Sequence, residues 1–253
     1  MTISIITATY NSANTIKDTL ASVAAQQYPF VEHIIIDGSS KDETLVIVDD
    51  FKHVSRVISE KDNGIYDAMN KGVQLATGDI VGILNSDDFY TGPAILSKVA
   101  EAFEDPRVEA VYGDLQYVRS DNVQSITRTW KAGNYKKRYL YYGWMPPHPT
   151  FFVRRHIYER CGMFNTTLRS AADYELMLRV LLKYDTCVHY IPEVLVKMRA
   201  GGMSNASLKN RLRANKEDVL AWKLNNLQPY FFTTWLKPLR KILQFNPINI
   251  WQK

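Results

Sequence analysis

Two adjacent aspartates, Asp87 and Asp88, stand in the stretch LNSDDFY, directly after a short apolar run. Neighbouring carboxylates repel each other and resist burial unless a positive group lies beside them. One interpretation is a solvated turn that caps a helix. The other is a site for a divalent metal that binds phosphate oxygens, because hard cations prefer oxygen ligands. Two acids alone leave both interpretations open.

The elements around the two acids follow a strand and helix alternation. Four apolar runs predict strands, and the three segments between them have helical spacing, as at Ile16, Leu20 and Val23. The strands are ISIITAT, HIIIDGS, VSRVISE and GDIVGILNSDD, and the helices are SANTIKDTLASVAAQQ, KDETLVIVDDF and IYDAMNKGVQLA. This order predicts an α/β fold with a mostly parallel sheet covered on both faces.

Polar loops follow each of these strands, and they read TYNS, DGSS, EKDNG and NSDD. The carboxyl ends of parallel strands meet at one edge, where such sheets bind ligands. The acids there are Asp37, Asp62, Asp87 and Asp88. They suit a nucleotide whose diphosphate is bridged by a metal. The sequence has neither a GxxxxGK[ST] loop nor a GxGxxG motif after the first strand, so the metal and basic groups must hold the phosphates.

The pattern changes near residue 105. VEAVYGDLQYV and VQSITRTW predict an antiparallel pair, HIYERCG and AADYELMLRVLLKY predict helices, and CVHYIPEVLVKMR predicts a strand pair. A glycine loop, GGMSN, and a charged helix, LKNRLRANKEDVLAWKL, follow. We therefore expect a nucleotide-binding half over 1–105, an acceptor-binding half of the same domain over 106–205, and a basic, aromatic helical segment over 206–253.

Composition fits a folded protein of the cytoplasm. The chain has 253 residues, of which 46% are hydrophobic, enough for a real core. The cysteines, Cys161 and Cys187, and five scattered histidines match no disulfide or zinc pattern. The chain starts in an apolar strand without a basic leader, and no apolar stretch is as long as a membrane span. We expect a reducing, cytoplasmic setting.

The positive charge lies at the C-terminus. Residues 207–253 carry a net charge of +7, whereas residues 1–206 carry −2. Packing of this segment on the body of the protein is one interpretation, and peripheral binding to an anionic inner membrane leaflet is the one we favour. We expect no nucleic acid partner, because no nucleic-acid-binding module accompanies the charge. The apolar face would hold Trp235, Leu236, Leu239, Ile242 and Leu243, and the basic face Lys237, Arg240 and Lys241.

Five segments in this order and spacing resemble the inverting family 2 glycosyltransferases with the GT-A fold, over roughly residues 3–205. They are SIITATYN, IIIDGSSKDET, SEKDNGIYDAMNKG, LNSDDFY and AADYELMLR. The resemblance implies a Rossmann-like nucleotide-diphospho-sugar transferase fold with an acceptor-side half and a C-terminal helical tail. Within the family, the chain is most similar to bacterial enzymes of O-antigen, capsule or exopolysaccharide synthesis. A strict DxD motif is absent, since Asn85 stands where its first aspartate would be.

The resemblance also implies the donor site. Asp88 is the expected ligand of a divalent metal, Mn²⁺ or Mg²⁺. A helix cap for Asn11, and ordinary turns for Asp37 and Asp62, are the structural alternatives. Lys71 could also approach the donor, although a solvated helix face explains it. The residues expected to contact the nucleotide are Ala8, Tyr10, Asn11, Asp37, Asp62, Asn70 and Asp87.

Asp173 matches the catalytic base of the family, which takes the proton of the attacking sugar hydroxyl. It begins the predicted helix DYELMLRVLLKY, so a plain first-turn acid is the alternative. Glu175 is a lesser candidate for the base. His148, in PPHPTFF, matches a position on the acceptor or diphosphate side, although a structural role is as consistent with its prolines.

Together these features predict an inverting transferase that moves a hexose from a nucleoside diphosphate sugar, expected to be UDP-linked, to a hydroxyl of a lipid-linked bacterial glycan. A nucleotidyltransferase that makes sugar nucleotides is an alternative. It would need glycine and arginine in the first loop, and TATYNSANT has neither. A non-catalytic sugar-nucleotide-binding protein is the other alternative, which Asp173 argues against.

Overall fold

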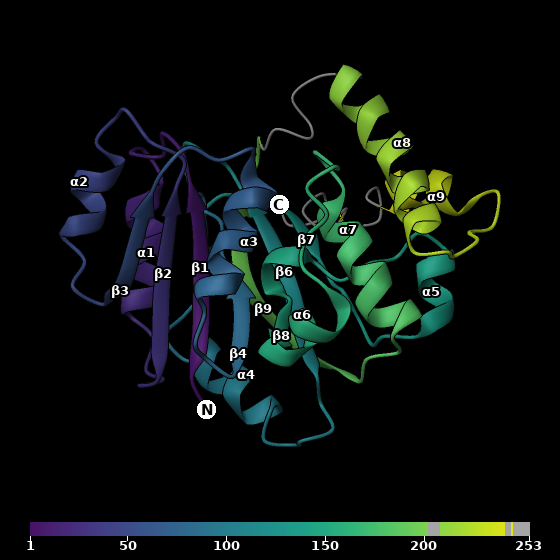
Figure 1. Ribbon diagram of the computed structural model, residues 1–253, viewed down its shortest axis with the longest axis horizontal. Coiled ribbons are helices and arrows are strands. Elements are labelled where there is room, and N and C mark those ends of the chain that lie inside the picture. The colour runs from purple at the N-terminus through teal and green to yellow at the C-terminus, as the bar shows by residue number, and fades with distance from the viewer. Residues whose placement is uncertain (202–207, 241–243, 245–253) are drawn as a thin grey trace, which may run out of the picture.

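A single mixed sheet organises the computed structural model, which describes residues 1–201, 208–240 and 244, with side chains omitted for 208–212. The strand order is β3-β2-β1-β4-β8-β6-β9-β5, and β7 pairs with β6 (Figure 1). Strands β3, β2, β1 and β4 are parallel neighbours, as predicted. The α/β fold class with a mostly parallel central sheet is confirmed.

The first part of the chain alternates strands and helices where the hydrophobic pattern predicts them. The elements are β1 (Ile3–Thr9), α1 (Ile16–Ala24), β2 (Val31–Asp37), α2 (Thr44–Asp49), β3 (Val54–Ser59), α3 (Ile65–Leu75) and β4 (Ile80–Ile83). Then follow β5 (Asp88–Tyr90) and α4 (Ile95–Ala102).

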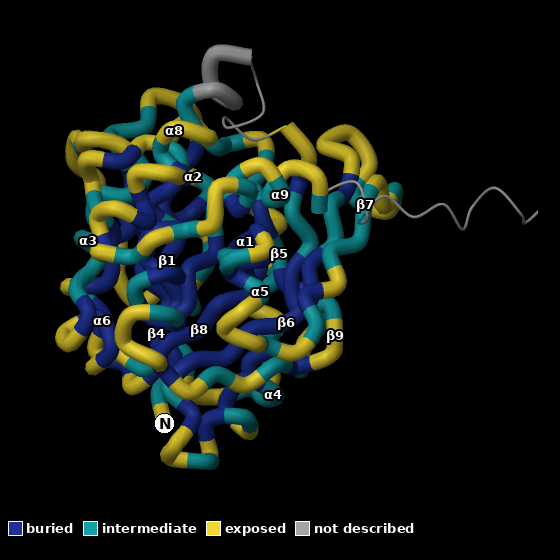
Figure 2. The backbone as a smooth tube through the Cα atoms, turned by 90° about the vertical axis from the view of Figure 1, so that its right-hand side faces the viewer, coloured by how far each residue is buried: buried dark blue, intermediate teal, exposed yellow. Residues whose placement is uncertain are grey.

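Alternate side chains of the central strands fill two separate cores. Ile6 of β1 packs in the core that includes α3, α6 (Arg155–Cys161) and α7 (Ala172–Met177). Ile5 packs on the opposite face, in the core that includes α4. Because side chains of a strand alternate between faces, a strand covered on both faces is buried throughout, as β1 is (Figure 2).

The second part adds antiparallel strands to the same sheet. The long predicted pair is present as β6 (Ala110–Val118) and β7 (Ile126–Trp130). Strand β8 (Phe152–Arg154) joins β4 to β6, so the sheet runs without a break past residue 105. The short elements between are α5 (Lys137–Tyr141) and a 3₁₀ turn, η1 (His148–Thr150).

The predicted strand pair in CVHYIPEVLVKMR is wrong. The segment is one strand, β9 (Val188–Arg199), which passes Pro192 without turning back. Its pairing with β6 shifts register around Asp114. A proline within a strand is tolerated at such an irregularity, because no regular ladder bond is required there.

Strand β5 forms the far edge of the sheet and pairs with β9 alone, with Asp88 opposite Met198. Asp88 therefore begins a strand and is buried, whereas the sequence placed it in a loop after the fourth strand. A three-residue strand has no periodicity that could have predicted it.

Helices cover the end of the sheet near β6 and β7 (Figure 1). Helix α7 runs into a π-helical segment, η2 (Leu178–Lys183), and the predicted charged helix is present as α8 (Leu208–Leu224). Trp222 Nε1 of α8 donates to the Tyr174 hydroxyl of α7 at 2.9 Å, which joins the two helices. Helix α9 (Thr233–Arg240) packs beside α8. Among the described residues, no helix has the length and apolar character of a membrane span.

Candidate active site

The four loops that follow β1 to β4 meet at one edge of the sheet, as predicted. The Ser12 hydroxyl lies 2.9 Å from that of Ser86, which joins the first loop to the acidic turn. The Lys41 amide donates to Asn11 Oδ1 at 2.8 Å, which joins the first loop to the second. Asn11 therefore links two loops and does not cap α1, which begins at Ile16.

Tyr10, Gly38 and Asp62 form one wall of this edge. A Cβ at Gly38 would lie 2.6 Å from Asp62 Oδ2 and 3.3 Å from the Tyr10 ring, so a larger residue there would displace the Asp62 carboxylate. Tyr10 is 61% exposed. An exposed aromatic ring beside a carboxylate, at the carboxyl end of a parallel sheet, can stack on a base while the acid accepts hydrogen bonds.

Asp37 and Ala8 are more deeply buried than residues of a binding loop are expected to be. Asp37 is fully buried, and its carboxylate accepts from the Ser40 hydroxyl and amide and, at 2.6 Å, from the Ser59 hydroxyl. Ala8 is buried within β1. Asp37 could therefore accept from a base only by sharing or exchanging these partners.

Asn70 has a structural role in this arrangement. Its side-chain amide donates to the Phe164 carbonyl and accepts from the Phe164 amide, both at 2.9 Å. This pairing occupies both ends of the amide and gives no support to the predicted nucleotide contact. Lys71 is likewise occupied, by Glu60 at 2.7 Å.

Asp87 and Asp88 differ in their surroundings although they are neighbours. Asp88 is fully buried, and burial followed by the Asp87 charge raises the pKa of Asp88 well above its ordinary range. Burial also raises the pKa of Asp87, and the charges of Arg199 and His148 partly offset this. Two carboxylates held in this way disfavour their own charged forms, a cost that a bound cation would remove.

Two side-chain oxygen atoms, one of Asp88 and one of the nearby Asn85, are suitable ligands for a hard divalent cation. Asp88 Oδ1 and Asn85 Oδ1 are buried and have no hydrogen-bond partner. Buried polar atoms rarely stay unpaired without a reason, and such oxygens are the ligands that Mg²⁺ and Mn²⁺ prefer. No cluster of three or more His, Cys, Asp or Glu ligands occurs among the described residues, so further ligands would have to come from elsewhere, such as phosphate oxygens.

Asp173 lies in the first turn of α7, as predicted, and two side chains orient its carboxylate. The Tyr66 hydroxyl donates to Oδ1 at 3.2 Å, and His148 Nδ1 lies 3.4 Å from Oδ2. Burial and the Asp173 charge raise the pKa of Tyr66, so its hydroxyl stays a donor. The Tyr66 hydroxyl and the His148 ring therefore fix the position of the Asp173 carboxylate, and a positioned carboxylate can act as a general base.

His148 lies between Asp173 and Asp87. It contacts Asp173 and also acts electrostatically on Asp87. Tyr117 of β6 lies near both Asp88 and Asp173. Burial is the largest cause of its raised pKa, Arg128 opposes the rise, and the charges of Asp88 and Asp173 add to it. The two adjacent acids and the predicted base therefore lie near the same histidine and tyrosine.

Three side chains of this site have no role in the sequence-based prediction: Tyr66, Tyr117 and Arg199. Arg199 Nη1 donates to the Asp87 carbonyl at 2.7 Å, and Arg199 Nη2 pairs with Asp18 of α1. Tyr66 lies within the segment SEKDNGIYDAMNKG and could have been a candidate from sequence. Tyr117 and Arg199 are brought in by the pairing of β6 with β9, which no local pattern predicts.

Glu175, the lesser candidate for the base, has a different role. Its carboxylate pairs with Arg179 at 2.7 Å, and both side chains are largely buried. Glu175 Oε1 also accepts from Asn225 of the segment after α8 at 3.0 Å. Both oxygens of the Glu175 carboxylate are therefore engaged by largely buried partners, Arg179 and Asn225, which gives no support to a role as base.

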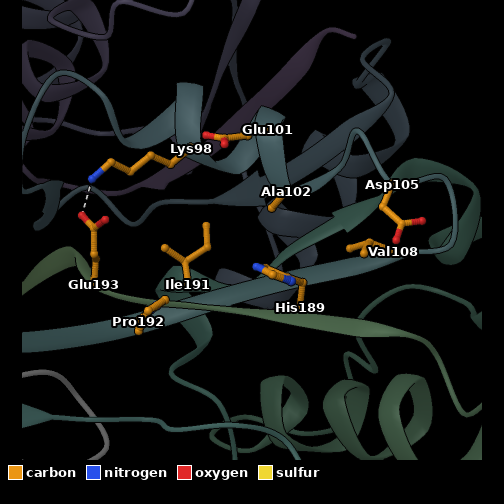
Figure 3. Close-up of a pocket in the computed structure, with 9 residues that line it drawn as sticks. All are labelled: Lys98, Glu101, Ala102, Asp105, Val108, His189, Ile191, Pro192 and Glu193. Atoms are coloured by element: carbon orange, nitrogen blue, oxygen red, sulfur yellow. Dashed lines mark hydrogen bonds and ion pairs between the residues drawn. The ribbon is translucent and has the colours of Figure 1, made fainter.

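A hollow of about 470 Å³ lies away from this site, between α4 and the start of β9 (Figure 3). Its lining includes His189, Asp105 and the Lys98–Glu193 ion pair. It opens at the end of the sheet opposite the four loops (Figure 1). None of the predicted site residues lines it.

The chain is similar to known glycosyltransferases. Residues 4–162 match the family model described as glycosyl transferase family 2. The PGL/p-HBAD biosynthesis glycosyltransferase of Mycobacterium bovis (strain BCG / Pasteur 1173P2) is 33% identical over 208 residues, which cover 80% of this chain and 78% of the relative. The Escherichia coli UDP-Glc:alpha-D-GlcNAc-diphosphoundecaprenol beta-1,3-glucosyltransferase WfaP is 29% identical over 217 residues, which cover 83% of each chain.

Solved structures share the fold. S. aureus TarS 1-349 in complex with UDP-GlcNAc has a TM-score of 0.69 at 19% identity, covering 89% of this chain. The match covers 65% of the TarS chain, so this protein spans less than two thirds of it. The mannosyltransferase PcManGT from Pyrobaculum calidifontis, in complex with GDP-Man and Mn2+, has a TM-score of 0.65 at 21% identity, covering 92% of this chain and 67% of the other.

Proposed function

We propose that this chain, which belongs to glycosyl transferase family 2 and is a glycosyltransferase, moves a hexose from a nucleoside diphosphate sugar to an acceptor hydroxyl with inversion at the anomeric carbon. The observation that carries the proposal is the meeting of Asp88, His148 and Asp173 at one edge of the sheet. A base on one side of the donor sugar and the leaving diphosphate on the other suit one in-line displacement, which inverts the anomeric carbon.

The donor that we propose is UDP-linked. Tyr10 stacks on the base, Asp62 and Asp37 accept hydrogen bonds from the base, and Asp87 accepts from the ribose. The exposure of Tyr10 and its contact with Gly38 beside Asp62 support this assignment. The TarS structure contains UDP-GlcNAc and the name of WfaP gives UDP-Glc, whereas PcManGT contains GDP-Man. These proteins differ in their nucleobase, so the choice of uracil is part of our proposal.

The metal site that we propose consists of Asp88 with Asn85 beside it, for Mn²⁺ or Mg²⁺. The unpaired oxygens of these two side chains support it, and PcManGT contains Mn2+. The cation, when bound, would stabilise the negative charge of the leaving diphosphate. The protein's own part is to hold the two carboxylates: Arg199 fixes the Asp87 carbonyl, and the pairing of β5 with β9 fixes Asp88.

The catalytic base that we propose is Asp173. Its carboxylate takes the proton of the acceptor hydroxyl as the oxygen attacks the anomeric carbon. Tyr66 and His148 hold the carboxylate in place, which lowers the entropic cost of bringing it and the acceptor hydroxyl into the reactive geometry. His148 also faces the negative charge of the donor side, as its effect on Asp87 indicates.

The acceptor that we propose is a lipid-linked glycan on the cytoplasmic face of the inner membrane, during synthesis of a bacterial surface polysaccharide such as O-antigen. The M. bovis relative is named for PGL/p-HBAD biosynthesis, and the acceptor in the name of WfaP is a diphosphoundecaprenol-linked sugar. Membership of family 2 shows that the chain is a glycosyltransferase, which argues against the alternative of a nucleotidyltransferase. A protein that only binds sugar nucleotides would need no base, so the proposed role of Asp173 distinguishes our proposal from that alternative.

The test is transfer itself. UDP-glucose and UDP-GlcNAc are each incubated with the protein, Mn²⁺ and an alkyl-diphospho-GlcNAc acceptor, and the product is detected by mass spectrometry. The proton coupling constant at the new anomeric carbon then gives the stereochemistry. A product with the anomeric configuration of the donor would contradict the inverting mechanism. Donor binding without any transfer, across a panel of sugar acceptors, would favour the non-catalytic alternative.

A further inference from the structure

Helices α5 and α9 lie on the same side of the molecule (Figure 1). Large hydrophobic side chains are exposed on α9 and next to both helices. Phe231 is 91% exposed and Trp235 is 75% exposed, and Leu239, four residues after Trp235, shares its helix face. Tyr142 is exposed at the end of α5. Single exposed apolar residues are ordinary, but a cluster of this kind marks an interaction site.

The segment that carries this cluster is anchored to the body of the protein. The Thr233 hydroxyl donates to the Tyr141 carbonyl at 2.6 Å, and Lys237 Nζ pairs with Asp218 at 2.6 Å. A side chain at Gly143 would lie 2.5 Å from the Lys237 backbone nitrogen, so the two segments are in close contact. Helix α9 therefore packs on the body, as one interpretation of the sequence expects, and still exposes Trp235 and Leu239. Binding to a membrane stays a prediction.

The predicted basic face of α9 needs a correction. Lys237 points inward, with its ammonium 3.6 Å from the centre of the Tyr174 ring, so it is not available to bind an anionic surface outside the protein. Arg240 instead lines a hollow of about 370 Å³ together with Arg138 of α5, Tyr139, Tyr142 and Leu236. The basic surface is shared between two segments that are far apart in sequence. Ile242, Leu243 and Lys241 lie outside the described residues.

The two segments also lack acids. No Asp or Glu occurs between Asp121 and Glu159 or after Asp218. The neighbouring acids, Asp185 and Asp218, are paired with Lys137 and Lys237. The surface therefore combines apolar side chains at its tip with cations beside them and no acid on its own segments.

We propose that the α5–α9 surface, made of Arg138, Tyr142, Phe231, Trp235, Leu239 and Arg240, rests on an anionic lipid bilayer. Phe231, Trp235 and Leu239 enter the boundary between headgroups and acyl chains, where aromatic rings are favoured. Arg138 and Arg240 contact the lipid phosphates. A second copy of the chain is a poorer partner, because a symmetric dimer would face two positive surfaces toward each other.

This inference rests on the proposed lipid-linked acceptor for its choice of partner, but its test measures binding alone. Wild-type protein is sedimented with vesicles of phosphatidylcholine, or of equal parts phosphatidylcholine and phosphatidylglycerol. We expect binding to the anionic vesicles that weakens as salt rises. The double variant Trp235→Ser/Leu239→Ser should lose affinity by about tenfold or more. Arg138→Gln/Arg240→Gln should lose about fivefold for each arginine.

Matched controls remove the same groups elsewhere. Phe30→Ser/Val46→Ser changes two exposed apolar side chains, and Lys17→Gln/Arg56→Gln changes two exposed cations on α1 and β3. Both should bind as wild type does. Thermal unfolding of every variant shows that the fold is kept, since all the changed side chains lie wholly or partly at the surface.

Three outcomes would overturn the inference. The first is that anionic vesicles do not retain the wild-type protein, and the second is that the surface and control variants bind equally. The third is a dimer in sedimentation equilibrium that Trp235→Ser/Leu239→Ser dissociates. The last result would make the surface a contact between copies. The variant Asp173→Asn separates this inference from the proposed reaction, because it should lose transfer and keep vesicle binding.

Discussion

His148 Nδ1 lies 3.4 Å from Asp173 Oδ2, so a 3₁₀ turn after β7 meets the first turn of α7. The contact leaves Asp173 with a neighbour on each carboxylate oxygen, since the Tyr66 hydroxyl donates to the other one. His148 also acts on Asp87. The histidine thus stands between the acid that we propose as base and the acids of the donor side.

Asp173→Asn should lower kcat by about 10²- to 10⁴-fold, because an amide keeps the shape of the carboxylate but cannot accept the proton. The KM for donor should change little, since Asp173 lies on the acceptor side. His148→Gln leaves the base in place and should lower kcat by less. Steady-state kinetics with a UDP-hexose measure both, and an unchanged kcat in Asp173→Asn would assign the base to another residue.

Asp88→Asn should remove metal binding and raise the thermal stability of the metal-free protein. Burial disfavours the charged carboxylate, and a neutral amide of similar shape avoids that cost. Mn²⁺ affinity should fall by more than the roughly 10- to 100-fold that loss of an outer-shell partner costs. Calorimetric titration and thermal unfolding with and without Mn²⁺ measure these effects. Asp49→Asn, at an exposed site on α2, is the control. Full transfer activity in chelator would contradict the metal assignment.

Tyr10→Ala should weaken UDP binding by about 1–3 kcal/mol, the usual contribution of one stacked base. Stability should not change, because the ring is mostly exposed. Calorimetric titration with UDP measures the affinity, and Tyr184→Ala, which removes another exposed ring, serves as the comparison. Equal UDP affinity in wild type and Tyr10→Ala would place the base elsewhere.

Glu175→Ala should destabilise the fold by about 3–5 kcal/mol, because it leaves the buried Arg179 without its partner. The Arg155–Glu159 pair has the same spacing on α6 but is exposed, so Glu159→Ala should cost only about 0–1 kcal/mol. Urea unfolding gives both values. If Glu175→Ala were as stable as Glu159→Ala and catalytically inactive, Glu175 would return as a candidate base.

His33 should make the fold sensitive to mild acid. Burial, and then the neighbouring His53 charge, lower the pKa of His33 to about 3, below its usual value of 6.5. The unfolded chain therefore takes up a proton first, and stability falls as pH drops below 6.5 toward 3, by about 1.4 kcal/mol per pH unit.

His33→Gln removes this titration and should flatten the dependence of unfolding free energy on pH between about pH 7 and pH 5. The exposed His156 provides the matched variant, His156→Gln, which should keep the wild-type slope. Urea unfolding across this range measures the slopes. Identical slopes in wild type and His33→Gln would exclude His33 as the source.

The part of the fold that the sequence predicts is the part built from local patterns. Ile16, Leu20 and Val23 of α1 are buried as their spacing requires, and β1 is buried throughout. Strand β5, the continuation of β9 past Pro192 and the crossing of β8 between β4 and β6 depend on pairings between distant segments. Such pairings leave no mark on neighbouring residues.

The site follows the same division. The loops that carry Tyr10, Asp62 and Asp87 could be predicted because they follow parallel strands, whereas the strand that Asp88 begins could not. The occupied amide of Asn70 and the ion pair of Glu175 could not, since their partners, Phe164 and Arg179, are chosen by packing. Sequence thus predicts which groups meet at the edge of the sheet but not which of them are already engaged.

Strand β5 has a consequence for protein engineering. Asp88 belongs by sequence to the half that we propose binds the donor, yet the strand that pairs with its own in the sheet is β9, from the second half of the chain. A chimera that joins the first 105 residues of one relative to the remainder of another would separate the aspartate from the backbone that holds it. Exchange of donor specificity between relatives therefore requires that β5 and β9 be transplanted as a matched pair.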